Sequence, residues 1–389
     1  MRRALIVDVV RTPFAKGRAD GALSAVHPVD LLAYTLKGLI ARAGIDPGAV
    51  DDVIAGCVIQ VGEQAANIGR QAWLAAGFPE AVPAVTIDRK CGSAQQAMDF
   101  AAQGVMAGAY DLVIACGVEM MSRVPMGSNR RGKDHLGPML RRRYAEGLVH
   151  QGISAELIAA RWGLTREALD AYALRSHQRA AAAEDRGVFA RDILPIDGAS
   201  TDEGVRRSTS AERLAALEPA FVDAGTAERF PEIGWVVTAG NSSQVSDGAS
   251  AMLIASEEAA QRSALTPRAA ITHFAVCGDD PVLMLTGIIP ATQKLLARSG
   301  QALDDIDCFE VNEAFASVVL AWAETLGVDL DRVNVNGGAI AFGHPVGASG
   351  GRLTANLIGS LEETGGRLGL QTMCESGGMA NATLIERLG

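Results

Sequence analysis

Two pairs of similar segments are separated by one constant distance along the chain. The apolar run VDDVIAG, which contains Asp51, is echoed by IDCFEVN, which contains Asp307, an offset of 256 residues (307 − 51). The run LVIACG from Leu112 is echoed by LGLQTMC from Leu368, again at an offset of 256 (368 − 112). Two separate pairs that share one offset indicate an internal duplication. We therefore expect two similar halves.

Each half has the pattern of an α/β structure. Short apolar runs such as AVPAVTID are typical of strands, and intervening stretches such as SAQQAMDFAAQGVMA have helical periodicity. The middle of the chain is instead rich in Arg, Ser, Asp and Glu and contains amphipathic stretches such as SAELIAARWG. We expect a first half made of residues 1–119 and 247–268, an inserted domain at 120–246 and a second half at 269–389.

The composition argues against several classes of function. With 389 residues, 48% of them hydrophobic, the chain can bury more than one core. Its apolar runs are interrupted before membrane-spanning length and its start lacks a signal-peptide pattern, so we expect a cytoplasmic protein with no membrane span. A net charge of −10 and 5% aromatic content argue against nucleic-acid binding. The six cysteines include no CxxC pair, so neither a disulfide framework nor a metal site is expected.

Cys91 lies between the apolar run that ends in VTID and a predicted helix that begins near Gly92 or Ser93. Unpaired backbone N–H groups and the helix dipole favour a thiolate at such a position. Gly92 also lets a substrate approach the backbone closely. Cys91 is therefore a candidate nucleophile, and the alternative is a buried cysteine at the end of a strand.

The loop GHPVGASGG places His344 in the second half near the position that Cys91 takes in the first. Adding the offset to Cys91 gives residue 347 (91 + 256), which lies in this loop. His344 stands between Gly343 and Pro345 on a constrained turn, and its small neighbours are expected to leave the ring open to a ligand. A surface histidine or a phosphate-binding loop is the alternative, although the loop matches neither GxxxxGK[ST] nor GxGxxG.

Two further polar positions follow apolar runs in the second half. Cys374 precedes a Ser-Gly-Gly turn and lies near the counterpart of Cys116 (116 + 256 = 372), so the two halves would contribute different cysteines to one cleft. Asn312 and Glu313 follow a strand-like run in FEVNEAFASVV. Two explanations of Asn312 are equally good: it caps a helix, or it holds a water or polarises a carbonyl.

Together, these motifs make the chain similar to the thiolase family. RTPFAKGR, CGSAQQA, NEAFA, GHPVGASGG and CESGGMANA occur in the family's order, and the resemblance covers essentially the whole chain. It implies the thiolase fold, in which duplicated α/β halves with mixed five-stranded sheets form a layered α-β-α-β-α core with an inserted loop domain. It also implies a homodimer or homotetramer.

The resemblance implies an acyltransferase that uses coenzyme A to cleave a 3-ketoacyl-CoA through an acyl-enzyme. Cys91 would take the acyl group, and His344 would activate it as general base. Cys374 would exchange a proton with the α-carbon of acetyl-CoA, while Asn312 would hold a water that stabilises the enolate with His344. The backbone N–H groups of Cys91 and Ser376 would form a second oxyanion hole. Many thiolases have glycine in place of Ser376, so its hydroxyl could narrow the pocket.

Coenzyme A is expected as a substrate that lies across the inserted domain, with no permanently bound cofactor. His150 in VHQG matches a histidine that lines the pantetheine channel, and Ser243 in TAGNSSQVSDGAS matches a pantetheine contact. Arg206 aligns with an arginine near the adenine, whereas Arg213 replaces a serine, so adenine or phosphate contacts are expected to differ. The basic run NRRGKDHLGPMLRRRY would attract the CoA phosphates or, equally, form a solvated or subunit-contacting face.

The sequence leaves the direction and substrate of the reaction open. Thiolysis of a 3-ketoacyl-CoA is thermodynamically favoured over condensation. The segment GIDPGAVDDVIAGCV resembles bacterial degradative thiolases, including ones that handle steroid-derived thioesters. We expect degradation of fatty-acid or steroid-derived thioesters, with acetoacetyl-CoA thiolase acting in Claisen condensation as the alternative. The non-enzymatic alternative is a silent acyl-CoA binding protein, against which Cys91, His344 and Cys374 together argue. Decarboxylating condensing enzymes usually carry two histidines and sterol-carrier-type proteins lack NEAF, so neither matches.

Overall fold

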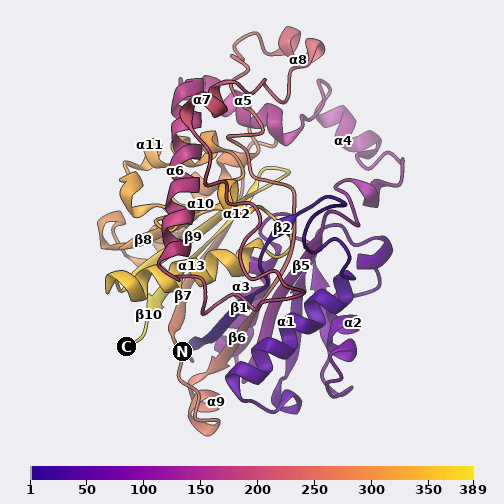
Figure 1. Ribbon diagram of the computed structural model, residues 1–389, viewed down its shortest axis with the longest axis vertical. Helices are drawn as coiled ribbons and strands as arrows, with labels where there is room; N and C mark the ends of the chain where they lie inside the picture. Colours follow the sequence, from indigo (N-terminus) through magenta and orange to yellow (C-terminus); the bar gives the residue numbers. More distant parts are fainter. Residues whose placement is uncertain (1) are drawn as a thin grey trace.

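The strands of the computed structural model, which describes residues 2–389, form two groups with the same order and direction (Figure 1). The first group runs β4-β3-β5-β6-β1 and the second runs β8-β9-β10-β7. Parallel pairing changes to antiparallel at β5–β6 and at β9–β10. The strands are β1 (Ala4–Arg11), β2 (Ala15–Lys16, beside β6), β3 (Asp52–Gly56), β4 (Ala84–Ile87), β5 (Leu112–Met120), β6 (Ser246–Ser256), β7 (Ala269–Gly278), β8 (Cys308–Val311), β9 (Leu368–Glu375) and β10 (Met379–Arg387).

Two details differ from a pair of separate five-stranded sheets. In the second group, the fifth position is a single parallel bridge between Phe309 and Val333. The two groups also join, because residues 4–6 of β1 pair with residues 269–271 of β7 in antiparallel fashion. This pairing satisfies backbone groups that a free edge strand would leave open.

The helices complete the expected five layers. Side chains alternate along a strand, so Ile114 of β5 faces one apolar cluster while Val113 faces another. The first cluster includes α1 and α2, the second includes α3 and α13 between the two halves, and a third joins α10 and α11 to β8, β9 and β10. These helices are α1 (Pro28–Ala43), α2 (Ile68–Ala75), α3 (Ser93–Ala107), α10 (Ile288–Ser299), α11 (Ala316–Leu326) and α13 (Ser349–Thr364). The layered α-β-α-β-α fold is thus confirmed.

The duplication extends to individual hydrogen bonds. Asp51 accepts the N–H groups of Asp111 and Leu112 at the start of β5, at 2.6 and 2.9 Å. Asp307 accepts the N–H groups at the same two positions of β9, at 2.7 and 2.9 Å. The helices α3 and α13 also begin 256 residues apart (349 − 93). The offset in the sequence therefore reflects equivalent backbone positions.

The segment between β5 and β6 carries most of the remaining helices, of which α4, α5, α7 and α8 lie at the top of Figure 1 and α6 extends from there down the left side of the core. Its helices are α4 (Gly137–Arg143), α5 (Gln151–Arg161), α6 (Arg166–Asp185), α7 (Ala211–Ala215) and α8 (Ala224–Arg229). The same segment contains a 3₁₀ turn at Ser128–Arg130. Outside it lie α9 (Glu257–Arg262), α12 (Ala339–Phe342) and the 3₁₀ turns Pro47–Ala49, Gly62–Gln64, Leu285–Gly287, Leu303–Asp305 and Leu330–Arg332. Across residues 2–389, no helix has both the length and the apolar character needed to cross a membrane.

Candidate active site

Cys91 lies in a tight turn between β4 and α3. The residue before it, Lys90, has a φ of +50°, a left-handed conformation that residues other than glycine rarely adopt. The turn is closed by the Gly92 N–H to the Arg89 carbonyl at 3.1 Å and by the Ser93 N–H to the Lys90 carbonyl at 3.0 Å. As predicted, Cys91 therefore emerges at the N-terminal end of a helix, with 8% of its surface exposed.

Two backbone N–H groups favour the charged form of the Cys91 sulfur, its own and that of Ser376. These are the two donors for which the family resemblance implies an oxyanion hole. Burial, followed by the nearby Glu375 carboxyl, raises the pKa of Cys91 to about 12 although the N–H groups act in the opposite direction. The resting protein therefore holds a neutral thiol at pH 7, and a base must remove its proton.

The ring of His344 is oriented so that one nitrogen can act as that base. Its Nδ1 lies 2.6 Å from Ser349 Oγ, and because the Ser349 hydroxyl donates to the carbonyl of Pro345 at 2.9 Å, it accepts from Nδ1. Nε2 is then unprotonated and lies 3.4 Å from Asn312 Nδ2. Burial, and then Arg352, lowers the pKa of His344 to about 3, so the ring is neutral and can accept a proton.

The glycines near His344 allow the two halves to pack closely. A Cβ atom on Gly347 would come within 2.6 Å of the Val118 carbonyl, and one on Gly350 within 2.2 Å of the Gln95 nitrogen. The loop backbone thus lies directly against β5 and α3. The sequence predicts that these glycines leave the ring open, whereas the structure requires glycine because of this close contact between backbones.

Asn312 does not cap a helix, so that alternative is wrong. The helix α11 begins at Ala316 and its N-cap residue is Phe315. Asn312 is buried beside His344, and within the described chain its Oδ1 has no hydrogen-bond partner. A buried amide oxygen usually has a partner, so this position is suited to an ordered water or a ligand atom.

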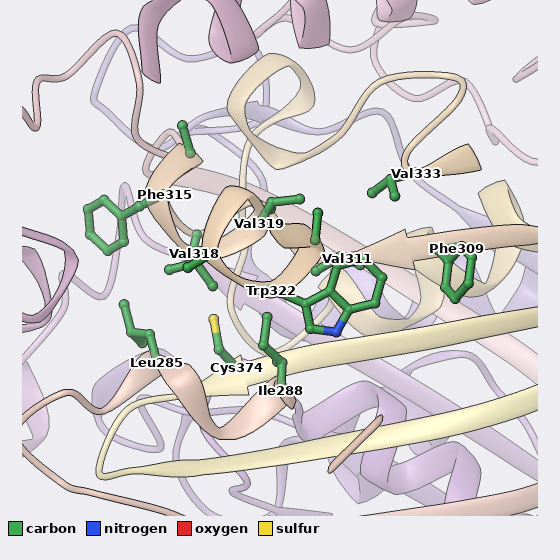
Figure 2. Close-up of a cluster of buried hydrophobic side chains, with 14 of the residues drawn as sticks. Leu285, Ile288, Phe309, Val311, Phe315, Val318, Val319, Trp322, Val333 and Cys374 are labelled. Carbon is green, nitrogen blue, oxygen red and sulfur yellow. The ribbon is translucent and has the colours of Figure 1, made fainter. Parts of the chain in front are cut away.

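Cys374 is at the end of β9, with its sulfur among apolar side chains of the outer layer. Figure 2 shows it beside Leu285, Ile288 and Val318. Burial raises the pKa of Cys374 well above its usual value, and the nearby Cys91 and Glu375 raise it further. Cys374 is therefore a neutral thiol that can donate a proton to a strong base such as an enolate.

A cavity of about 300 Å³ brings together most of the residues that the sequence singled out. Its wall contains Cys91, His344, Ser376, His150 and Ser243. Cys374 and Asn312 are not part of this wall and are next to Cys91 and His344 respectively. Much of the remaining surface is apolar and is formed by Val58, Ile59, Met121, Met126, Val346 and Phe315. Such a cavity suits an acyl group beside a nucleophile.

A second cavity, of about 460 Å³, shares two residues with the first. These are His150 and Phe221, whose rings are 5.5 Å apart. Its wall also includes Arg229 and Phe230, at and just after the end of α8, with the guanidinium 4.5 Å from the ring. No local sequence pattern marks this cavity, so it cannot be predicted from the sequence.

Arg206 and Arg213, the two arginines considered for coenzyme A, differ in their contacts. Arg206 is exposed, and its Nη2 donates to Gln244 Oε1 at 3.4 Å, which links it to the wall of the catalytic cavity. Arg213 folds back onto Ser208, where its Nη1 donates to the hydroxyl at 2.8 Å and to the carbonyl at 2.9 Å. Of the two, Arg206 is the better placed to meet a ligand that extends from Cys91.

Two residues that shape this site were missed from the sequence. Ser349 was counted among the small residues of its loop, although its hydroxyl orients His344. Glu119 lies inside the apolar run LVIACGVEM, where no local signal marks it. Its carboxylate accepts the N–H groups of Val58 at 2.9 Å, Ile59 at 3.2 Å and Gly347 at 3.1 Å. Spatial contacts between distant segments create its role.

A duplicated α/β core that places a cysteine and a neutral histidine in the wall of one cavity, with a second cysteine close to the first, defines an acyltransferase that works through a thioester. Residues 4–258 match the family model described as thiolase, N-terminal domain, and residues 265–387 match the thiolase C-terminal domain. The chain belongs to the thiolase family.

Individual relatives agree along the whole chain. It is 48% identical over 400 residues to the steroid 3-ketoacyl-CoA thiolase of Mycobacterium tuberculosis, covering 100% of this chain and 95% of that one. It is 43% identical over 402 residues to the 3-ketoacyl-CoA thiolase of Aliivibrio fischeri, covering 100% of both. Among solved structures, human mitochondrial 3-ketoacyl-CoA thiolase in complex with CoA has a TM-score of 0.88 at 36% identity, covering 100% of this chain and 98% of that one. The Bacillus anthracis acetyl-CoA acetyltransferase also has a TM-score of 0.88, at 38% identity, covering 100% and 99%.

Proposed function

We propose that this thiolase cleaves a 3-ketoacyl-CoA with coenzyme A, giving acetyl-CoA and a shortened acyl-CoA in a degradative β-oxidation. The observation that carries the proposal is Cys91 in the wall of a largely apolar cavity, together with the unprotonated Nε2 of His344 and the N–H of Ser376. The names of the relatives from Mycobacterium tuberculosis and Aliivibrio fischeri support the same activity.

The first half-reaction transfers the acyl group to the enzyme. His344 Nε2 takes the proton of Cys91, and the thiolate attacks the ketone carbon of the substrate. The bond between that carbon and the α-carbon then breaks, and its electron pair becomes the enolate of acetyl-CoA. Cys374 donates its proton to the α-carbon of this enolate and becomes a thiolate. Acetyl-CoA leaves with Cys91 acylated.

The second half-reaction returns the enzyme to its starting state. Coenzyme A enters as a thiol, Cys374 takes its proton, and the resulting thiolate attacks the acyl group on Cys91. The bond to Cys91 breaks, its sulfur recovers the proton held by His344, and the shortened acyl-CoA leaves. In both half-reactions the N–H groups of Cys91 and Ser376 would stabilise the oxyanion on the transferred acyl carbon, and a water held by Asn312 and His344 would stabilise the enolate.

Coenzyme A would act as a substrate and extend from Cys91 across the inserted domain at 120–246. Ser243 and His150 line the cavity, which supports pantetheine contacts at these two residues. Arg206 is hydrogen-bonded to Gln244 of the cavity wall, which supports a contact of Arg206 near the adenine. We assign the enzyme to the cytoplasm. We also propose that it forms a homodimer or homotetramer. The strand β4 lies at the edge of the sheet with Val85 42% exposed, and such an edge can pair with a second copy of the chain.

The acyl group is proposed to be derived from a fatty acid or a steroid. The apolar cavity at Cys91 and the larger neighbouring cavity behind His150 and Phe221 support a bulky substrate. The 48% identity to a relative named for steroid 3-ketoacyl-CoA supports the steroid-derived class. The assay should therefore compare ring-bearing and straight-chain 3-ketoacyl-CoAs.

Intact-protein mass spectrometry with peptide mapping tests the proposal. After mixing with a 3-ketoacyl-CoA, an acyl adduct on Cys91 and released acetyl-CoA are expected. Cys91→Ala should form no adduct, whereas Cys374→Ala should accept an acyl group from a simple acyl-CoA yet fail to turn over. Cys277→Ala, which changes a half-buried cysteine outside the cavity wall, is the matched control and should behave as the wild type. A folded wild-type protein that forms no adduct with any thioester would support the silent binding protein instead.

A further inference from the structure

Glu375 has a buried carboxyl that lies close to both Cys91 and Cys374. It follows Cys374 at the end of β9 and is 0% exposed. Successive side chains of a strand point to opposite faces, so Cys374 faces the outer layer and Glu375 faces the middle layer. A Cβ atom on Gly92 would come within 2.1 Å of Glu375 Oε1, so the carboxyl lies directly against the residue that follows Cys91.

The carboxyl has no hydrogen-bond partner within residues 2–389, at either oxygen. Asn381 on β10, which also lies against Gly92, donates from Nδ2 to the Gly92 carbonyl at 3.2 Å and leaves its own Oδ1 unpaired. A buried carboxylate needs donors to offset its lost hydration, whereas a neutral acid needs far fewer. This geometry therefore favours the protonated form of Glu375.

The charges that face Glu375 do not remove this preference. Burial raises the pKa of Glu375 to about 8, Arg89 acts in the opposite direction, and Asp99 and Asp88 raise it. The titratable and charged groups around it come from the turn before α3, from α3 and from its own strand, and they are Asp88, Arg89, Lys90, Cys91, Asp99 and Cys374. Arg89 is partly exposed and offsets only part of the lost hydration, and the Lys90 ammonium is paired with Asp88 at 2.6 Å.

We propose, building on the proposed thiolase reaction, that Glu375 is a positioning residue whose neutral form permits Cys91 and Cys374 to become thiolates in turn, and whose ionisation suppresses both. Each thiolate of the reaction would form within reach of this side chain, in surroundings that screen charge poorly. A glutamate anion there would place two negative charges at one buried site. Loss of the Glu375 proton to solvent would therefore make the site self-limiting at alkaline pH.

The test is the rate at which iodoacetamide alkylates Cys91 in the full-length protein between pH 6 and 10, followed by peptide mass. This rate reports the thiolate fraction of Cys91 and does not require turnover, so its outcome is independent of the proposed thiolysis. In the wild type, the rate should rise about tenfold per pH unit, flatten for about one unit above pH 8 and then rise again. In Glu375→Gln, the rise should continue without the flat step, giving about tenfold faster alkylation than the wild type at pH 9.5.

Two further variants separate this role from a structural one. Asp99→Asn removes another buried carboxyl, whose pKa is also raised to about 8, and should keep the flat step or move it to lower pH. Glu375→Asp retains an acid and should keep the flat step even if Glu375→Gln fails to fold. The proposal is overturned if the wild type and Glu375→Gln give superimposable profiles, if Glu375→Gln is slower by one factor at every pH, or if Glu375→Asp gives an unbroken rise.

Discussion

Glu119, in the first half of the chain, accepts the backbone N–H of Gly347, in the second half, at 3.1 Å. The same carboxylate accepts the N–H groups of Val58 and Ile59, which line the catalytic cavity. One buried side chain therefore fixes the distance between the apolar wall of the cavity and the loop that carries His344.

Replacing Glu119 with Gln should damage both stability and catalysis. The amide turns one acceptor oxygen into a donor that faces N–H groups, so the free energy of unfolding should fall by about 2–4 kcal/mol. The shifted His344 loop should lower kcat about tenfold or more. Urea unfolding and steady-state kinetics measure the two effects.

Glu156→Gln is the matched control for that experiment. Glu156 is also a buried glutamate that accepts two backbone N–H groups, those of Val236 and Val237 at 2.9 and 2.8 Å, but it lies outside the cavity wall. This variant should lose stability and keep its kcat. Equal losses of kcat in both variants would mean that Glu119 acts through general stability alone.

Ser349→Ala should impair the base without removing it. Without the hydroxyl that accepts from Nδ1, the proton of His344 can move to Nε2, which then cannot deprotonate Cys91. We expect kcat/KM to fall roughly 10- to 100-fold, a range typical of lost orienting contacts. Ser250→Ala is the control, because the Ser250 hydroxyl donates to the Ala348 carbonyl of the same loop and does not touch His344. Equal activity of Ser349→Ala and the wild type would contradict this orienting role.

Local patterns predicted most of the fold. The offset of 256 paired the segments that form β3 and β8 and those that form β5 and β9, because duplicated segments keep the same alternation of apolar residues. The helical periodicity of SAQQAMDFAAQGVMA predicted a helix that begins near Gly92 or Ser93, and α3 begins at Ser93. Such features depend on residues that are close together in the sequence, so they can be predicted from it.

Contacts between distant segments account for what the sequence did not predict. The glycine at Gly347 is needed because it meets Val118, more than two hundred positions earlier (347 − 118 = 229). Likewise, the neutral state of Glu375 depends on its burial against Gly92 (375 − 92 = 283). Burial and charge state emerge from tertiary packing, so no local motif encodes them.

Arg206→Ala should weaken the binding of coenzyme A selectively. Arg206 has an exposed guanidinium with one long hydrogen bond to Gln244, so its charge is available to a phosphate or to the adenine. We expect the Kd for coenzyme A, measured by calorimetry, to rise about five- to tenfold, which is roughly 1 kcal/mol. Arg207→Ala is the control, since Arg207 is already paired with Glu184 and Asp185 and should leave the Kd unchanged. An unchanged Kd in Arg206→Ala would remove it from the binding path.

Asp99 should make the stability of the folded protein fall as the pH rises. Burial is the main cause that raises the pKa of Asp99 to about 8, although Thr383 donates to its Oδ1 at 2.8 Å. In the unfolded chain an aspartate has a pKa of about 3.9. Between these two values the folded state binds one more proton than the unfolded state, so stability present below about pH 4 is lost as the pH rises towards 8.

Asp99→Asn should remove this dependence, because the amide does not titrate. The free energy of unfolding of the wild type relative to Asp99→Asn should decrease by up to about 5 kcal/mol between pH 4 and pH 8, at about 1.4 kcal/mol for each pKa unit. Urea unfolding of both proteins at pH 5, 6.5 and 8 provides the comparison, and the difference between the two cancels the contributions of the buried carboxyls that Asp99 does not influence. Glu375, whose pKa Asp99 raises, is excluded by repeating the comparison in a Glu375→Gln background. A difference that stays constant across this range would show that Asp99 is ionised in the folded protein.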